Sequence, residues 1–195
     1  LEEAIKGVDV SGSVVYRYDN VDDKIVDKNS SKTDNNKYKI GLNLSSKVND
    51  YVKFNSRFIV GAANTYDFVS TNAHKDTTNN GKRDSGDGSA DVTLSQAYFG
   101  FTAIPNTVVN IGKQGLTTPY TVAVDINGNE QAGTGILALS TFGPITAGAG
   151  YFNNTNVDLS GNGYINTSDL ALDGGSDMYV ATVQGDLDFV KLEAW

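Results

Sequence analysis

The feature that most constrains this chain is a two-residue alternation of apolar and polar side chains that recurs along its length. In the stretch DVSGSVVYRYD, residues on one face are apolar or glycine and those between them are mostly polar. Such a period places alternate side chains on opposite faces of a β-strand. Eight further runs are strand-like, the later ones rich in Ala and Gly: YKIGLNLSSK, YVKFNSRFIVG, VTLSQAYFGFT, VVNIGKQ, GILALSTF, TAGAGYF, MYVATVQG and VKLEAW. Since no segment keeps a helical apolar stripe for three turns, an all-β chain of about nine strands is expected.

The connections between these runs alternate strictly in length. Long connections occupy 20–36, 63–89, 115–134 and 154–176, and short ones 48–50, 103–107, 143–145 and 186–189. Outer-membrane barrels combine long extracellular loops with short periplasmic turns, whereas a soluble sandwich has no reason to place every long loop at one end. The sequence therefore predicts an antiparallel transmembrane β-barrel, with a soluble β-sandwich as the alternative.

Aromatic residues gather near the ends of the expected strands. The group on the long-loop side is Tyr16, Tyr18, Tyr38, Tyr151 and Tyr179, and the group on the short-turn side is Tyr51, Phe54, Phe99, Phe101 and Phe142. Two such girdles are typical of barrels that cross a membrane. The polar face between them carries cationic side chains, which suit a water-filled lumen better than a protein core.

The composition excludes several classes of function. With 23 acidic and 15 basic residues the net charge is −8, which opposes binding to nucleic acid through phosphate contacts. The chain has no cysteine and one histidine, His74, so it offers no thiolate chemistry and no histidine-based triad or zinc site. Because it also lacks a phosphate-binding loop, an enzyme is not expected.

Several stretches resemble a known family. They are LEEAIK and DVSG…YRYD at the amino terminus, VNIGKQGLTTPYTVAVD and NEQAGTGILALST in the middle, and GDLDFVKLEAW at the end. Over essentially its whole length the chain resembles the Campylobacter-type major outer membrane porin. The resemblance implies a homotrimer of 18-stranded barrels in the bacterial outer membrane, passing ions and small hydrophilic solutes. Nine strands are half of such a barrel, so residues 1–195 are expected to be the amino-terminal part of one barrel domain.

The same resemblance implies that the third long loop, residues 115–134, folds inward as a constriction. Arg17, Lys39 and Arg57 share the polar faces of adjacent strands, and we expect them to form a basic patch on the inner wall. Asp125 and Glu130 of the loop would face that patch and create a field across the pore; the alternative is that they are solvated loop carboxylates. The acidic balance predicts mild cation selectivity.

The stretch DLSGNGYINTSD spaces oxygen ligands as a calcium loop does. The candidate ligands are Asp158, Ser160, Asn162, Tyr164 and Asp169, with Tyr164 offering its backbone carbonyl. A weaker copy lies at 76–87. No amphipathic helices flank either loop, so a calcium sensor is not expected, and affinity would be about 10⁻⁴–10⁻³ M. The alternative is that these residue types simply favour turns.

Calcium is the only cofactor the sequence suggests, and none is expected to be required. Outer-membrane lipid and lipopolysaccharide are the remaining expected partners, the latter bound through acidic surface loops. The competing function is a calcium-binding, β-rich surface adhesin or binding protein. Partition into detergent and ion-conducting steps in planar bilayers would distinguish a porin from an adhesin.

Overall fold

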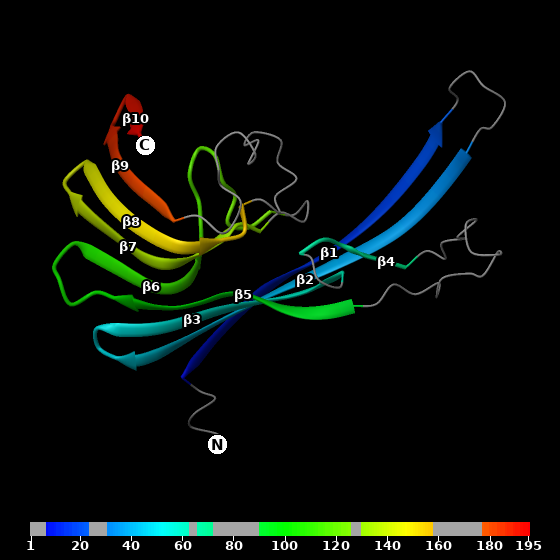
Figure 1. Cartoon of the computed structure of the whole chain (residues 1–195), viewed down its shortest axis with the longest axis horizontal. Coiled ribbons are helices and arrows are strands. Elements are labelled where there is room, and N and C mark those ends of the chain that lie inside the picture. The colour runs from blue at the N-terminus through cyan, green and yellow to red at the C-terminus, as the bar shows by residue number, and fades with distance from the viewer. Residues whose placement is uncertain (1–6, 24–30, 63–65, 72–89, 126–129, 158–176) are drawn as a thin grey trace.

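The computed structural model describes residues 7–23, 31–62, 66–71, 90–125, 130–157 and 177–195, with backbone only for 21–23 and 31–34. These residues form one antiparallel sheet (Figure 1). Its strands are β1 (Val8–Asp23), β2 (Ser31–Asn49), β3 (Val52–Ala62), β4 (Val69–Ser70), β5 (Ala90–Phe101), β6 (Thr107–Gly115), β7 (Ala132–Phe142), β8 (Ile145–Thr155), β9 (Met178–Leu187) and β10 (Val190–Ala194). In the part of the chain that the structure describes, no helix is long and apolar enough to cross a membrane.

The strand order follows the chain, β1-β2-β3-β5-β6-β7-β8-β9-β10, and the short β4 pairs with β2 beside this path. The prediction of an all-β antiparallel fold is confirmed, and each of the nine expected runs forms a strand. β4 was not expected. The sheet is curved and not closed, with β1 and β10 at its two edges (Figure 1).

The hairpin of β1 and β2 is longer than the sequence indicates. Its strands contain 16 and 19 residues, and their pairing continues from Val8↔Ser46 to Asp23↔Ser31. The expected connection at 20–36 is therefore too long, because pairing continues where the alternation of apolar residues has stopped. About 9–11 tilted residues are enough to cross a membrane. The hairpin accordingly projects well beyond the other strands (Figure 1).

Short turns close four of the hairpins tightly. Phe142 pairs with Ile145, so only two residues, Gly143 and Pro144, join β7 to β8. Gly143 has a φ of 58°, a left-handed value that two-residue hairpin turns require. Asn106 and Asp188 take positive φ in two other short turns. Tight turns of this kind set the register of the strands they connect.

One face of the sheet is apolar and exposed; we call it the outer face. It carries Val10, Val14, Tyr16, Val92, Leu94, Phe99, Ile111, Ile136, Tyr151, Tyr179 and Val183, each at least 36% exposed. Neighbouring strands place some of these aromatic rings together. The Phe54 and Phe99 centroids lie 5.2 Å apart, and those of Tyr151 and Tyr179 lie 5.0 Å apart. Exposed apolar area on this scale indicates a non-aqueous environment.

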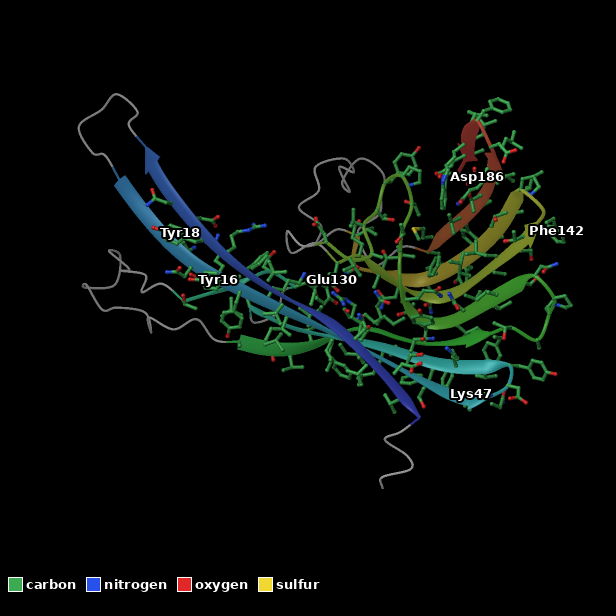
Figure 2. All side chains as sticks on the ribbon, turned by 180° about the vertical axis from the view of Figure 1, so that it is seen from behind. Tyr16, Tyr18, Lys47, Glu130, Phe142 and Asp186 are labelled. Carbon is green, nitrogen blue, oxygen red and sulfur yellow. The ribbon has the colours of Figure 1, made fainter. Side chains whose placement is uncertain are left out.

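The ends of the outer face agree with the predicted girdles. Figure 2 places Tyr16 and Tyr18 along the projecting hairpin and Phe142 at the opposite, short-turn end, where Lys47 and Asp186 also lie. Glu130 lies between these two ends (Figure 2). The inner face, opposite the aromatic residues, carries charged side chains such as Lys39 and Arg57, and it contacts Leu116, Asp125 and Glu130 of the segment between β6 and β7.

Candidate functional site

The described residues of the segment between β6 and β7, 116–125 and 130–131, lie against the inner face; we call them the inner loop. Its two ends meet, because the Leu116 amide donates to the Gln131 carbonyl at 2.8 Å. Near its start it makes a tight turn over Thr118-Pro119-Tyr120-Thr121, a sequence with proline at the second position, which favours β-turns. The Thr118 hydroxyl accepts from the Tyr120 amide at 3.1 Å and pairs with the Thr121 hydroxyl at 2.9 Å.

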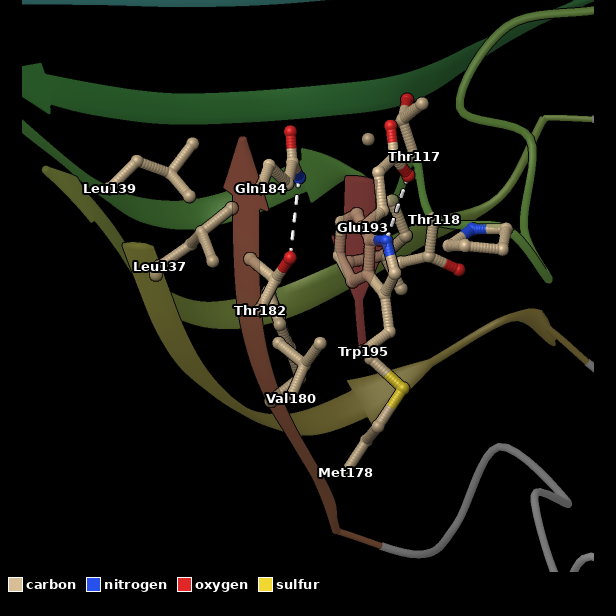
Figure 3. A pocket seen from close by; sticks show the side chains of 15 residues that line it. Thr117, Thr118, Leu137, Leu139, Met178, Val180, Thr182, Gln184, Glu193 and Trp195 are labelled. Atoms are coloured by element: carbon tan, nitrogen blue, oxygen red, sulfur yellow. Dashed lines mark hydrogen bonds between the residues drawn. The ribbon is translucent and has the colours of Figure 1, made fainter. Parts of the chain in front are cut away.

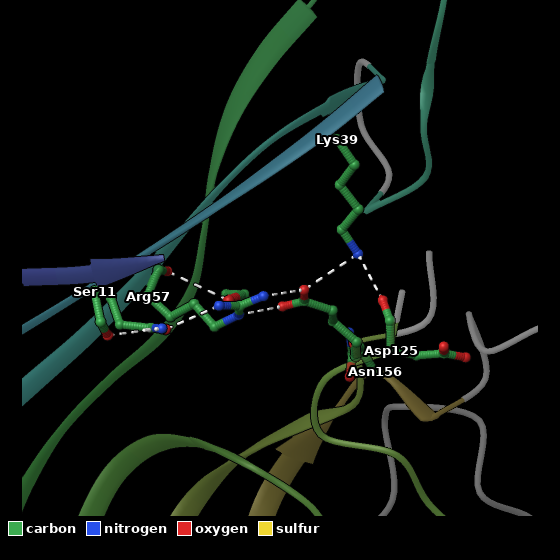
Figure 4. Close-up of polar contacts among 8 residues, drawn as sticks. Ser11, Lys39, Arg57, Asp125 and Asn156 are labelled. Carbon is green, nitrogen blue, oxygen red and sulfur yellow. Dashed lines mark hydrogen bonds and ion pairs between the residues drawn. The ribbon is translucent and has the colours of Figure 1, made fainter. Parts of the chain in front are cut away.

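An ion cluster holds the carboxyl-terminal end of the inner loop. The Arg57 guanidinium donates to both oxygens of Glu130, from Nε at 2.9 Å and from a terminal nitrogen at 2.8 Å (Figure 4). The Lys39 ammonium lies 3.2 Å from the same carboxylate. The three side chains are between 1% and 6% exposed. Bidentate arginine–carboxylate pairs are strong and directional, so the cluster fixes the position of Glu130.

Cross-strand pairing places the arginine for this contact. Arg57 of β3 faces Asn43 of β2, whose Oδ1 accepts from the guanidinium at 2.8 Å. Asn43 in turn faces Ser11 of β1 and donates to its hydroxyl at 3.4 Å. A Cβ at Gly41 would lie 2.6 Å from a guanidinium nitrogen, so only glycine leaves the arginine its space. The Ser95 hydroxyl donates to the Arg57 carbonyl at 3.3 Å from a β-bulge in β5.

The structure thus brings three of the five predicted pore residues into direct contact. Lys39 and Arg57 do not face Glu130 across an opening; they bind it. Two cations contact one carboxylate, so the negative charge of Glu130 is fully paired. Glu130 therefore joins the loop to the wall and is not exposed to water.

The other two predicted residues lie outside these ion pairs. Asp125 contacts the cluster through its main-chain carbonyl, which accepts from the Lys39 ammonium at 3.3 Å. Arg17 stacks its guanidinium over the ring of Phe68 at 4.5 Å from the centroid, a cation–π contact with the segment that leads into β4. Arg17 is therefore part of the wall above the cluster and not part of the cluster itself.

Asn156, which the sequence did not single out, holds the inner loop from the β8 side. Its Nδ2 donates to the Glu130 carbonyl at 2.9 Å, and its Oδ1 accepts from the Ala132 amide at 2.7 Å. Its own amide donates to the Ala132 carbonyl at 3.1 Å. Three hydrogen bonds thus fix the backbone on both sides of Gln131. The Gln131 side chain is buried, and its Nε2 has no hydrogen-bond partner among the described residues.

The amino-terminal end of the inner loop is held by apolar packing. Leu116, Phe152 and Val157 are at most 3% exposed and form one cluster. Leu137, Met178 and Val180 pack against it from β7 and β9. The strands below the loop therefore present apolar side chains to the inner face, which the sequence did not predict, because the Ala- and Gly-rich runs left the faces of these strands open.

The wall formed by β3, β5 and β6 is polar towards its short-turn end. A shallow cavity of about 470 Å³ there is lined by residues that include Lys53, Asn55, Tyr98 and Asn110. A Cβ at Gly100 would lie 3.2 Å from the Asn110 carbonyl oxygen, so the amide side chain lies directly over the glycine. The polar residues of this wall agree with the alternation of the sequence.

The predicted calcium ligands at 158–169 and the weaker copy at 76–87 lie outside the described residues. Within the described ranges, no group of three or more His, Asp or Glu residues gathers in a way that would hold a metal ion. The calcium loops therefore stay predictions.

A sheet with an apolar exposed outer face, and an inner face that carries charged and polar side chains and binds a loop between two strands, defines a β-barrel protein of the bacterial outer membrane. Comparison with known families gives the particular group. The chain belongs to the Campylobacter major outer membrane protein family, whose model matches residues 1–187. Its place is accordingly the outer membrane.

Among curated proteins the chain finds no match. Among solved structures it is similar to OpdL of Pseudomonas aeruginosa, with 13% sequence identity and a TM-score of 0.46. The similarity covers 92% of this chain and 41% of that protein. The chain thus spans less than half the length of this solved relative.

Proposed function

We propose that the chain forms the amino-terminal part of a general diffusion porin that passes ions and small hydrophilic solutes. The observation that carries the proposal is the inner loop, which is bound at both ends to the inner face of a sheet whose outer face is apolar. In a barrel wide enough to hold water, a loop fixed in this way narrows the path without closing it. Family membership supports the same function.

Passage through such a pore requires no chemical step. The loop limits solute size because its position is fixed by the buried contacts of Glu130 and Leu116. Hydroxyls and amides of the polar wall, such as those of Asn55 and Asn110, replace part of a solute's hydration. The proposed role is therefore that of a channel and not of an enzyme, and it needs no cofactor.

Mild cation selectivity is part of the proposal. The chain carries a net charge of −8, and a pore mouth lined by one sign of charge concentrates the opposite ion. Asp125 is the loop carboxylate that we assign to selectivity, because Glu130 is neutralised by two cations. A homotrimer surrounded by outer-membrane lipid and lipopolysaccharide completes the proposal, and the exposed outer face suits contact with lipid.

The test is conductance in planar lipid bilayers, with the protein purified from outer membranes. We expect ion-conducting steps, and a reversal potential in a KCl gradient that reports a preference for K⁺. Asp125→Lys is expected to move the reversal potential towards anions. Asp50→Lys, in an exposed turn where the aspartate pairs with Lys47, is the matched control and should move it less.

Two outcomes contradict the proposal at different levels. An unchanged reversal potential in Asp125→Lys would dismiss the role of that carboxylate while leaving the porin in place. Absence of conducting steps, together with purification without detergent, would favour the calcium-binding surface adhesin instead.

A further inference from the structure

The inner face contains an open apolar groove beside the start of the inner loop. Its volume is about 460 Å³, and its floor includes Leu137 and Leu139 of β7 and Val180 of β9 (Figure 3). Leu116 and Phe152 belong both to the groove and to the buried cluster that holds the loop. The floor residues are only partly buried, so apolar surface remains open on the lumen side.

Glycines of β8 make this floor continuous. A Cβ at Gly150 would lie 3.0 Å from Leu137 Cδ1 and 3.0 Å from Val180 Cγ1. A Cβ at Gly148 would collide with the Leu139 side chain. The side chains of β7 and β9 therefore lie over the bare backbone of β8. The strands β7, β8 and β9 thus form one continuous apolar surface.

The rim of the groove is polar on the β9–β10 side. Gln184 donates to the Thr182 hydroxyl at 3.3 Å, and the Trp195 indole donates to a carboxylate oxygen of Glu193 at 3.0 Å (Figure 3). Among the described residues that line the groove, Glu193 alone is charged. The groove therefore combines an apolar floor, one negative charge and one indole ring.

We propose that this groove binds organic ammonium ions that carry an apolar body. The Glu193 carboxylate attracts the ammonium, and an indole face such as that of Trp195 attracts a cation through its quadrupole. The apolar body packs on Leu137, Leu139 and Val180. This contact is more favourable than one with a polar wall, because apolar surface on both sides is removed from water. Barrel interiors are ordinarily polar, so an open apolar patch in one indicates a ligand of this mixed chemistry.

The inference rests on the proposed porin function, since a solute reaches the groove through the water-filled lumen. A solute bound there lies directly beside the narrowed part of the path, below Leu116 to Pro119. Its occupancy therefore interrupts the ion current for as long as it stays bound. Interruption of current is a direct readout of binding.

The experiment uses protein purified from outer membranes in planar bilayers, with phenyltrimethylammonium as the probe. Tetramethylammonium lacks the apolar body, and benzenesulfonate lacks the cation. We expect phenyltrimethylammonium to interrupt the K⁺ current at a concentration about tenfold lower than tetramethylammonium, because its ring buries apolar area on the floor. Benzenesulfonate is expected to leave the current unchanged.

Two variants locate the site. Leu139→Asn should abolish the advantage of the phenyl group, and Glu193→Gln should raise the concentration at which either ammonium acts. Val108→Asn is the matched control: Val108 is a half-exposed valine that lines the separate polar cavity, so its replacement should change nothing. If Leu139→Asn does not insert into the bilayer, the concentration at which the ammonium ions act on Glu193→Gln decides the test. Glu193 is exposed and lies outside the buried cluster, so this variant is expected to fold.

Equal potency of the two ammonium ions, or interruption unaffected by both groove variants, would overturn the inference. The conductance without probe reports on the porin itself. Normal steps without interruption reject only the groove, whereas absence of steps rejects the porin and the groove with it.

Discussion

The two ends of the inner loop are held by opposite kinds of interaction. At one end Glu130 meets Lys39 and Arg57 in a buried ion cluster; at the other, Leu116 packs with Phe152 in an apolar cluster. An ion pair with a bidentate arginine fixes the distance and the orientation between its two side chains. Apolar contacts depend on the buried area and tolerate small shifts of the side chains. We infer that the ionic end sets the position of the loop and the apolar end sets how firmly it stays there.

Glu130→Ala should have the largest effect, because it leaves two buried cations without their carboxylate. Breaking one partner of a buried ion pair destabilises by about 3–5 kcal/mol. We expect a lower urea midpoint in detergent and larger, noisier conductance steps as the loop is released. Asp50→Ala removes an exposed ion pair and serves as the control, with a much smaller effect. A Glu130→Ala channel with wild-type midpoint and wild-type noise would show that the cluster does not hold the loop.

Leu116→Ala tests the apolar end. Leucine-to-alanine changes in a packed core cost about 2–5 kcal/mol, and we expect the lower half of that range because the open groove lets neighbouring side chains relax. The urea midpoint should fall, while the reversal potential should stay as in wild type since no charge moves. Leu116→Met, which keeps the volume, should cost less than about 1.5 kcal/mol. A change of ion selectivity in Leu116→Ala would contradict the inference that the ionic end and the apolar end of the inner loop have separate roles.

Asn156→Ala tests the link between the ends, because this side chain binds the backbone on both sides of Gln131. Removing it leaves the Ala132 amide without its acceptor, which costs about 1–3 kcal/mol. Asn156→Asp keeps the acceptor for Ala132 but loses the donor to the Glu130 carbonyl, and so separates the two bonds. Unfolding by urea in detergent gives both values. Equal stability of wild type and Asn156→Ala would contradict a structural role.

The smallest effect is expected from calcium. The predicted calcium ligands lie within residues 158–169, which follow Val157 in the sequence. Calorimetric titration of the wild type should give a dissociation constant of about 10⁻⁴–10⁻³ M. Asp158→Ala and Asp169→Ala should each remove the signal, and identical binding in all three proteins would reject the site.

The sequence predicts those parts of the fold that depend on local patterns of residues. The nine strands other than β4 follow from alternation, which needs only neighbouring residues. β4 was missed because Val69 and Ser70 are too few to show a period. Residues 20–23 and 31–36 are polar apart from Val21, so the sequence shows no alternation there and indicates a loop, although these residues continue the β1–β2 hairpin.

The sequence predicts the candidate site only in part. The charged residues on the polar face were identified, but contact between Arg57 and Glu130 joins residues 73 positions apart, and no local pattern encodes it. The expected field across open space became a direct ion pair, and Arg17 stacks on Phe68 instead. Asn156 gave no signal, since an asparagine after a strand is ordinary turn chemistry.

The length of the β1–β2 hairpin has a consequence for how far the sheet extends past the membrane. A strand of 19 residues is about 8 residues longer than the hydrocarbon layer requires, which leaves roughly 25 Å of strand outside it at about 3.3 Å per residue. Pairing between the two strands keeps this projecting part of the hairpin extended. Outer-membrane barrels turn their long connections outward, so we expect this hairpin to reach further from the membrane than the other described strands on that side.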